Sequence, residues 1–465
     1  MKRLILAALT ASALTSPALA QRTAPPMPAT VDPQVAQLRD AALKDDTAWD
    51  IIEGLTTEVG QRLAGTEAEA RARTWAVAKL TALGFKNVRV EPYRMPVWER
   101  GAETAEIIAP FPQKLTLAAL GNSGATPATG LTGDVVVFAN MAAFQAAPDN
   151  AIKGRIVYIG NAMPRTQDGS GYGAYGTARF VGPALASQRG AVAIIIRSIG
   201  TDHHRFPHTG TTDFPAGVKP IPAAALSVPD AEQLERIAAR GAPIRMKLVL
   251  TPRQVGMRES GNVVAEVPGS DPSAGIVLVG GHLDSWDLGT GAIDDASGIA
   301  ITAAAGKRIM DAGQPRRTIR VVWFGAEEVG GMGGAAYAKA HSGERHATAS
   351  ESDFGADRVW RFEVNLPPAA KPVADRLQTA LAPLGITRGS GLGGDGTDIG
   401  PTLKLGTAAI DLNQSGWDYF DTHHTPDDVI DRIDPAALRQ NVAAWTAMLA
   451  VVANAPEAID AVKPR

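Results

Sequence analysis

The stretch GIVLVGGHLDSWDLGTGAIDDASGIAITAAAGKRIMDAGQPRRTIRVVWF, residues 275–324, decides the fold class. It begins with a continuous apolar run, which is typical of a strand buried on both faces. Residues 297–313 then predict a helix, and residues 318–324 predict a second strand. Strands that alternate with helices in this way indicate an α/β domain, with a mostly parallel sheet and helices on both faces.

The pattern of the chain changes between residues 111 and 255. Short apolar runs such as GDVVVF, GRIVYIG and AVAIIIRS alternate there with turns. This predicts a small β-rich domain with one or two helices. Because the βα alternation resumes only after it, we expect this domain to be inserted into the α/β domain, which would comprise residues 21–110 and 256–465.

The N-terminus, MKRLILAALTASALTSPALA, predicts a signal peptide over residues 1–20. A basic start is followed by an apolar stretch and by Ala18-Leu19-Ala20, a cleavage site of the small-x-small type. The apolar stretch is too short to span a bilayer, and we expect no membrane-spanning segment elsewhere. The mature protein would start near Gln21 and be exported, to the periplasm or the extracellular space.

The composition of the chain limits which partners and which kinds of catalytic or metal site it can have. The net charge of -3 gives no reason to expect nucleic acid or an anionic membrane as partner. The chain has no cysteine, so thiol catalysis and thiolate metal sites are excluded. Any metal ion must be held by His, Asp and Glu.

Polar residues follow the predicted strands. They are His282, Asp284, Asp294 and Asp295 after the first strand, Glu327 and Glu328 after the second, then Glu351 and Asp353, and finally His423, His424, Asp427 and Asp428. Sites in such sheets gather at the carboxyl ends of the strands. We therefore expect these side chains to lie together.

A charge count relates this cluster to a pair of divalent ions. Two ions about 3.5–4 Å apart carry four positive charges. Three carboxylates and one bridging hydroxide neutralise them, and two imidazoles complete the shells. The sequence offers this set as His282, Asp294, Glu328, Asp353 and His424. One further carboxylate must stay free as the base for the bridging water.

Asp284 lies two residues after His282 in an extended segment, so both side chains can point the same way. The Asp284 carboxylate is then well placed to accept the second N–H of the imidazole and to fix its tautomer.

The motifs HLDSWDLGTGAIDDASG, FGAEEVGG, ESDFG and HHTPDD resemble, in order and spacing, the co-catalytic zinc aminopeptidase family. Within it, the likeness is to the plasma glutamate carboxypeptidases and their bacterial relatives. It extends to GQRLAGT near residue 60 and to GLGGDGTDIGP, residues 391–401. The resemblance implies a secreted exopeptidase with two Zn²⁺ per chain and an inserted protease-associated domain, and it allows a homodimer.

The resemblance also implies a role for each matching residue. Asp294 would bridge both ions, His282 and Asp353 would complete one zinc site, and Glu328 and His424 the other.

Glu327 would act as the general base and then as the acid for the leaving amine. The peptide bond between Asp294 and Asp295 is cis in such enzymes.

Two assignments stay open at this point. Only the spacing to TPDD favours His424 over His423, and Glu351 could replace Asp353 if the loop register differs.

Several weaker candidates concern the substrate. His208, in the segment DHHRFPHTG with His203 and His204, lies either in a surface loop or in a loop that folds over the cleft and contacts substrate. Trp286, Trp417 and Tyr419 flank ligand motifs and either line the pocket or pack beneath the ligand loops. Asp398 could face a substrate amine.

The leading hypothesis is a dinuclear zinc exopeptidase that acts on short peptides, either dipeptides or N-terminal residues. One alternative is acyl transfer like that of glutaminyl cyclases, which uses one zinc on the same fold. Another is a catalytically inert binding protein. No obvious arginine-rich clamp for a C-terminal carboxylate stands beside the ligand motifs, although Arg205 or Arg388 could reach from a distance.

Overall fold

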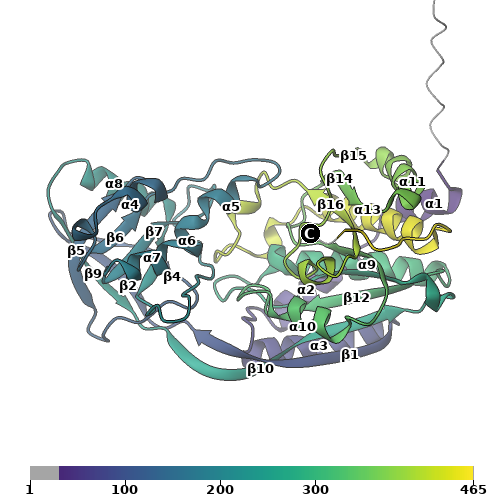
Figure 1. Cartoon of the computed structure of the whole chain (residues 1–465), viewed down its shortest axis with the longest axis horizontal. Helices are drawn as coiled ribbons and strands as arrows, with labels where there is room; N and C mark the ends of the chain where they lie inside the picture. The colour runs from purple at the N-terminus through teal and green to yellow at the C-terminus, as the bar shows by residue number, and fades with distance from the viewer. Residues whose placement is uncertain (1–30, 464–465) are drawn as a thin grey trace, which may run out of the picture.

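The computed structural model describes residues 31–463, so the predicted signal peptide and the start near Gln21 lie outside the described residues. The described chain forms two lobes, and each lobe is built on one eight-stranded sheet (Figure 1). A long ribbon of two strands runs from one lobe toward the other.

The first sheet has the order β1-β10-β12-β11-β13-β16-β14-β15. Its centre, β12-β11-β13-β16, is parallel, as the sequence predicts. Strands β1 and β10 pair in antiparallel fashion, and β14 is antiparallel to β16 and parallel to β15. The strands are β1 (Lys86–Glu99), β10 (Arg253–Val267), β11 (Ile276–His282), β12 (Thr318–Phe324), β13 (His346–Glu351), β14 (Val359–Asn365), β15 (Thr387–Arg388) and β16 (Ala408–Gln414).

Helices cover both faces of this sheet, which confirms the predicted α/β class. In β11, Val277 and Val279 pack into one apolar cluster and Leu278 into another on the opposite face. The first cluster includes residues of α1 (Pro33–Ala42), α2 (Thr47–Glu58), α3 (Glu67–Ala82), α9 (Ser297–Ala312), α11 (Lys371–Leu381) and α13 (Pro435–Asn454). The second includes residues of α10 (Met332–Ala340) and α12 (Gly400–Leu403).

Helix α13 is long and apolar enough to cross a membrane, which the sequence analysis did not expect of any segment after the N-terminus. Within the described residues it is the one such helix, and 89% of its apolar window is buried inside the protein. Burial of this kind is typical of a core helix that is apolar all round.

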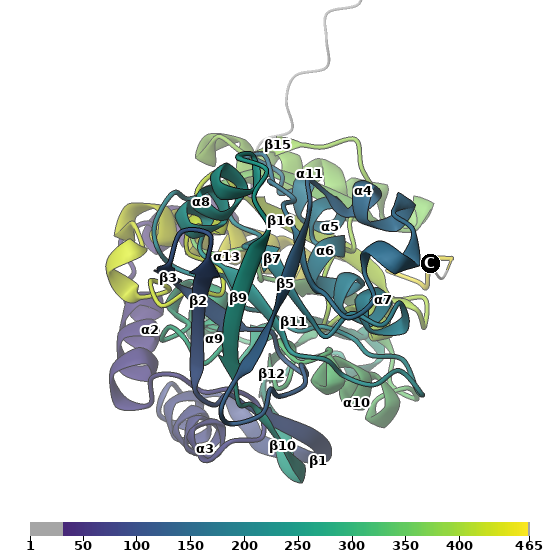
Figure 2. The ribbon, with the colours of Figure 1, turned by 90° about the vertical axis from the view of Figure 1, so that its left-hand side faces the viewer.

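The second sheet has the order β3-β2-β9-β5-β6-β7-β8-β4 and lies in the lobe that faces the viewer in Figure 2. Its strands are β2 (Glu103–Ala109), β3 (Gln113–Leu115), β4 (Leu117–Ala119), β5 (Leu131–Phe138), β6 (Ile156–Ile159), β7 (Ala193–Arg197), β8 (Ala223–Leu226) and β9 (Ile244–Leu250). Strand β2 pairs with β9, so this sheet starts at Glu103 rather than at the expected boundary of residue 111.

This second lobe carries more helices than the one or two expected. They are α4 (Met141–Ala146), α5 (Gly171–Tyr175), α6 (Thr177–Phe180), α7 (Gly182–Gln188) and α8 (Val228–Ala238). All except α8 span seven residues or fewer, which is too short to give a clear helical period in the sequence. Strands β5 to β8 are parallel, so the lobe is itself α/β.

The ribbon of β1 and β10 joins the lobes (Figure 1). Its pairing extends from Lys86 opposite Glu266 to Glu99 opposite Arg253. The lobes also meet at the C-terminal part of the chain, where the Thr201 N–H donates to the Phe420 carbonyl at 3.0 Å. The second lobe is therefore held against the carboxyl ends of the first sheet.

Candidate metal and catalytic site

The structure brings the predicted ligand residues together at the carboxyl ends of the parallel strands. His282 ends β11, Glu327 and Glu328 follow β12, and Asp353 follows β13. His424 comes from the loop between β16 and α13. The topology explains this convergence, because neighbouring parallel strands end at one edge of the sheet.

The first group consists of His282, Asp294 and Asp353, whose ligand atoms lie within 4.8 Å of one another. The His282 Nε2 atom lies 3.0 Å from Asp294 Oδ1 and 3.5 Å from Asp353 Oδ1. Its Nδ1 atom lies 2.9 Å from the carbonyl oxygen of Asp284, which can only accept, so Nδ1 carries the proton of the neutral ring. The Nε2 lone pair then faces two carboxylates. These groups repel one another unless a proton or a cation lies between them.

The second group is centred on His424. Its Nε2 atom lies 3.0 Å from Glu328 Oε2 and 3.4 Å from Asp294 Oδ2. Its Nδ1 atom lies 3.2 Å from the carbonyl oxygen of Thr209, so this nitrogen too carries the proton. Glu328 Oε1 is buried and has no hydrogen-bond partner among the described residues.

Asp294 links the two groups, because its Oδ1 faces His282 and its Oδ2 faces His424. Burial alone would raise the pKa of Asp294, but His282 and His424 more than offset it and hold the pKa well below its usual value. Burial raises the pKa of Asp353 to about 7. A carboxylate with one oxygen turned to each group is what a bridging ligand requires.

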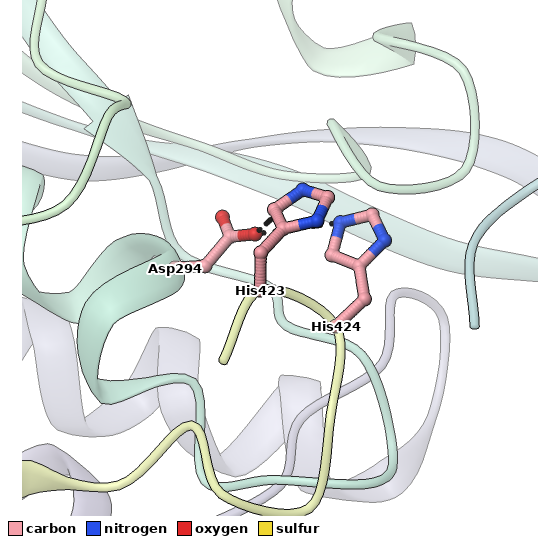
Figure 3. A group of neighbouring side chains, drawn as sticks. All are labelled: Asp294, His423 and His424. Carbon is pink, nitrogen blue, oxygen red and sulfur yellow. Dashed lines mark ion pairs between the residues drawn. The ribbon is translucent and has the colours of Figure 1, made fainter. Parts of the chain in front are cut away.

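His423 competes with His424 for Asp294. Figure 3 shows the two imidazoles together beside this carboxylate, and their rings stack at 3.5 Å. His423 Nε2 lies 3.5 Å from Asp294 Oδ2, but its Nδ1 has no partner among the described residues. Since His424 contacts both Asp294 and Glu328 and has its tautomer fixed by Thr209, the geometry favours His424 as the ligand.

Glu351 has a different role from Asp353. Its Oε2 accepts the backbone N–H groups of Asp398 and Ile399 at 3.0 and 2.9 Å. The carboxylate thus holds the turn after residue 396 and leaves the contact with His282 to Asp353.

The expectation that Asp398 faces a substrate amine is wrong in this structure. Its side chain is fully buried and does not line the cleft, whereas its neighbour Thr397 does. The turn holds Asp398 by its backbone, which packs on Gly334 and donates its N–H to the buried Glu351.

Glu327 lines the cleft beside the two groups. Burial raises its pKa above the usual value, and the charge of His282 and a hydrogen bond from Thr397 offset this only in part. A raised pKa makes the carboxylate a stronger base, which suits a group that takes a proton from water.

Asp284 joins the ends of two strands, although not as predicted. Its carbonyl, not its carboxylate, accepts from His282, and the carboxylate oxygen lies 3.7 Å from the ring nitrogen. That oxygen instead accepts the backbone N–H of Glu327 at 3.2 Å. The spacing of two residues predicts that Asp284 lies close to His282. It does not tell whether the main-chain carbonyl or the side-chain carboxylate of Asp284 accepts the hydrogen bond.

Two residues to which the sequence assigned no role, Asp428 and Arg62, hold the loop before Asp294. Asp428 accepts the N–H groups of Ile293 and Asp294 at 2.6 and 3.3 Å. The fully buried guanidinium of Arg62 donates to the carbonyls of Leu283, Thr290 and Gly291 at 2.5, 2.5 and 2.9 Å. Both residues lie in motifs that carry the family resemblance, HHTPDD and GQRLAGT, and those motifs are the sequence signal that could have identified them.

The peptide bond between Asp294 and Asp295 is cis, as the resemblance implies. Asp295 turns away from the two groups and accepts the backbone N–H of His282 at 3.0 Å and that of Gly298 at 2.9 Å.

The histidine-rich loop of the second lobe reaches the site through Thr209 rather than His208. His208 is buried, does not line the cleft, and lies with Nε2 2.6 Å from Asp202 Oδ1. The predicted contact of His208 with substrate is therefore not present. Thr209 pairs with His424 through its backbone, because its N–H donates to the His424 carbonyl at 3.0 Å and its own carbonyl accepts from the imidazole.

Of the three aromatic candidates, only one lines the cleft. Tyr419 lines the cleft and packs on His423, with ring centroids 5.1 Å apart. Trp286 is buried beneath the site, 5.8 Å from the ring of His424, and does not line the cleft. Trp417 is half exposed and also lies outside the lining.

The cleft itself has a volume of about 330 Å³ and both lobes contribute to it. The second lobe supplies Tyr172, Arg179, Phe180 and Thr211. The first supplies, among others, Asp294, Glu327, Glu328, Asp353, His423 and His424.

Comparisons with known proteins agree with this geometry. A model of peptidase family M28 matches residues 262–449, which include every predicted ligand. Carboxypeptidase Q of Bos taurus is 34% identical over 406 residues, which cover 87% of this chain and 84% of that protein. Carboxypeptidase Q of Homo sapiens shows the same identity and coverage.

Solved structures extend the likeness to both lobes. A peptidase M28 precursor from Shewanella amazonensis SB2B superposes with a TM-score of 0.90 at 44% identity, covering 93% of this chain and 98% of that one. A zinc aminopeptidase from Bacillus subtilis has a TM-score of 0.64 at 20% identity, covering 90% of this chain and 98% of that one. The second comparison supports the fold alone.

Proposed function

Because the chain belongs to peptidase family M28, we propose that it is an exopeptidase that holds two zinc ions and hydrolyses short peptides. The observation that carries the proposal is the position of Asp294 between two histidines. Each histidine has its Nδ1 proton committed to a carbonyl and its Nε2 lone pair turned toward carboxylates.

The donor set fits divalent ions. Asp294, Glu328 and Asp353 supply three carboxylates within reach of two imidazoles, and none of the three forms an ion pair with Lys or Arg among the described residues. Burying several carboxylates without a cation is costly. Imidazole and carboxylate together are ligands that zinc accepts.

Divalent ions bound there would supply Lewis acidity toward the scissile carbonyl and toward a water molecule. Glu327 would take the proton of the attacking water and pass it to the leaving amine. Asp284 would aid this by holding the backbone N–H of Glu327, which fixes where that side chain starts.

The experiment is removal and stepwise return of metal. The purified protein is dialysed against a chelator and assayed with an unblocked dipeptide, an N-blocked dipeptide and an aminoacyl chromogen. We expect turnover of the dipeptide to disappear and to return fully only with about two equivalents of zinc per chain. Full turnover by metal-free protein would contradict the proposal.

The same titration separates the alternatives. Full recovery with one equivalent would show that one ion suffices, as in glutaminyl cyclases, and no turnover of any substrate would favour an inert binding protein. Export rests on the sequence of residues 1–20, and sequencing the N-terminus of protein from a periplasmic fraction tests it. A homodimer is tested by light scattering.

A further inference from the structure

We propose that Arg179, held by Tyr172 in the second lobe, binds the C-terminal carboxylate of the substrate, so that the enzyme requires a peptide with a free C-terminus. This inference rests on the proposed function and specifies its substrate. It assigns to the second lobe the arginine that is not apparent beside the ligand motifs.

Arg179 lies in α6 and lines the same cleft as Glu327 and Asp353. It is the one Arg or Lys among the described residues of that lining. Its side chain is only 3% exposed. The cleft therefore has carboxylates and histidines on the first lobe and a buried guanidinium on the second.

The guanidinium has no acidic partner among the described residues. Nη2 donates to the Tyr172 hydroxyl at 2.5 Å and Nη1 to the Thr209 carbonyl at 3.2 Å. Nε is buried and has no partner there. A guanidinium has five N–H donors, so most of them stay free, and a buried cation without an anion is costly.

A purely structural role of Arg179 would use only some of its N–H donors. Support of Thr209, which orients His424, uses one N–H. The other close neighbour, His424 Nδ1 at 3.4 Å from Nη1, carries its own proton and cannot accept. The remaining donors suit an anion that enters the cleft.

The arginine is also fixed in place before any ligand binds. Its guanidinium carbon lies 4.4 Å from the ring centre of Phe180 and 5.3 Å from that of Tyr172. On another side it packs against Gly210, where a Cβ atom would lie 2.2 Å from Nη1. A rigid planar guanidinium matches a carboxylate with two parallel hydrogen bonds, and little entropy is lost on binding.

The size of the cleft limits the peptide. At about 330 Å³ the space lies at the lower end of the range for small-molecule sites. A substrate that places its scissile bond at Glu327 and its terminal carboxylate at Arg179 has few residues between the two. Dipeptides fit this requirement.

The test uses the zinc-loaded full chain and three substrates: Leu-Ala, its amide Leu-Ala-NH₂, and Leu-Asp-NH₂. We expect the wild-type kcat/KM to be about 10- to 100-fold higher for Leu-Ala than for Leu-Ala-NH₂, as a charge-assisted hydrogen-bonded pair would give. In Arg179→Met this ratio should fall to about one, mainly through KM for Leu-Ala. The Leu-Asp-NH₂ arm separates a terminal carboxylate from an acidic side chain.

Arg189→Met is the matched control. Arg189 lies in the same lobe and also stacks on an aromatic ring, that of Phe144 at 5.1 Å, but it pairs with Asp149 and is outside the cleft lining. Its substrate ratio should equal that of the wild type. If Arg179→Met does not fold, Arg179→Lys keeps the charge without the fork, and its ratio should lie between one and the wild-type value.

The outcomes divide clearly. An equal loss on Leu-Ala and Leu-Ala-NH₂ in the Arg179 variants, with metal content unchanged, would assign a positioning role and overturn the inference. So would a wild type that cleaves Leu-Ala and Leu-Ala-NH₂ equally well, or that prefers Leu-Asp-NH₂ over Leu-Ala. In these cases the proposed function stands, whereas a wild type that cleaves none of the three contradicts the proposed function itself.

Discussion

Two segments of the chain contain adjacent histidines close to acidic residues, and they behave differently. In residues 202–208, DHHRFPH, each histidine faces a single acid: His208 lies 2.6 Å and His204 3.6 Å from Asp202, and His203 lies 2.9 Å from Glu232. In residues 421–428, DTHHTPDD, His423 and His424 share one carboxylate, Asp294.

The difference lies in how donors and acceptors are balanced. In the first segment no histidine faces more than one carboxylate. In the second, His424 Nε2 faces both Glu328 and Asp294 while its proton is held by Thr209. An excess of lone pairs, rather than the number of histidines, marks the candidate metal site.

The largest expected effect is that of replacing Glu327, the carboxylate beside the candidate metal site that is predicted to bind no metal ion. Glu327→Gln should lower kcat by about 10²- to 10⁴-fold, because it removes the group that moves the proton. Metal content, measured by mass spectrometry of the dialysed protein, should stay at the wild-type level. Glu328→Gln is the comparison and should lose metal. If Glu327→Gln loses metal and Glu328→Gln keeps it, the two glutamates have been assigned the wrong way round.

The next effect distinguishes the two stacked histidines. His424→Ala should leave about one ion per chain, because it removes the imidazole that reaches both Asp294 and Glu328. His423→Ala should keep both ions, since the Nδ1 atom of this ring has no partner that would fix its tautomer. Metal analysis of both variants checks this, and the reverse pattern would make His423 the ligand.

The core of the fold could be predicted because its signals are local. The apolar run of β11, the helical pattern of α9 and the second run of β12 specify their elements without knowledge of the rest. Three of the proposed ligands, His282, Asp294 and Glu328, lie at or after the ends of these two strands, whereas Asp353 follows β13 and His424 follows β16. Topology alone brings them together.

The parts that could not be predicted depend on contacts between distant segments. Thr209 and Arg179 matter because the second lobe packs on the loop of His424, and the sequence does not show that contact. Asp398 and His208 looked like exposed polar residues but are buried. Burial of a single side chain follows from the path of its loop, which composition does not determine.

A smaller effect is expected at the buried pair of His208 and Asp202 in residues 202–208. His208→Ala should destabilise the protein by about 3–5 kcal/mol, because it removes the ring that pairs with the buried Asp202 and leaves the backbone N–H of His204 as the main partner of this carboxylate. Burial would raise the pKa of Asp202, but His208 more than offsets this and holds it below the usual value. The stabilisation is therefore present above pH of about 4 and is lost as the pH falls through the lowered pKa.

Urea denaturation of wild type and His208→Ala at several pH values checks this. The difference in the free energy of unfolding should be largest near neutral pH and shrink on acidification below about pH 4. A difference that grows on acidification would contradict the assignment of the pair.

The smallest effect should come from the exposed histidine of the same segment. His203 is 70% exposed and pairs with Glu232, which also contacts Arg197 at 2.9 Å. His203→Ala should change the free energy of unfolding by less than about 0.5 kcal/mol, because a surface ion pair is screened by solvent and Glu232 keeps its second partner. Metal content and kcat should equal those of the wild type. A loss of metal in this variant would show that the first segment also holds an ion, and the contrast between the two histidine segments would then be wrong.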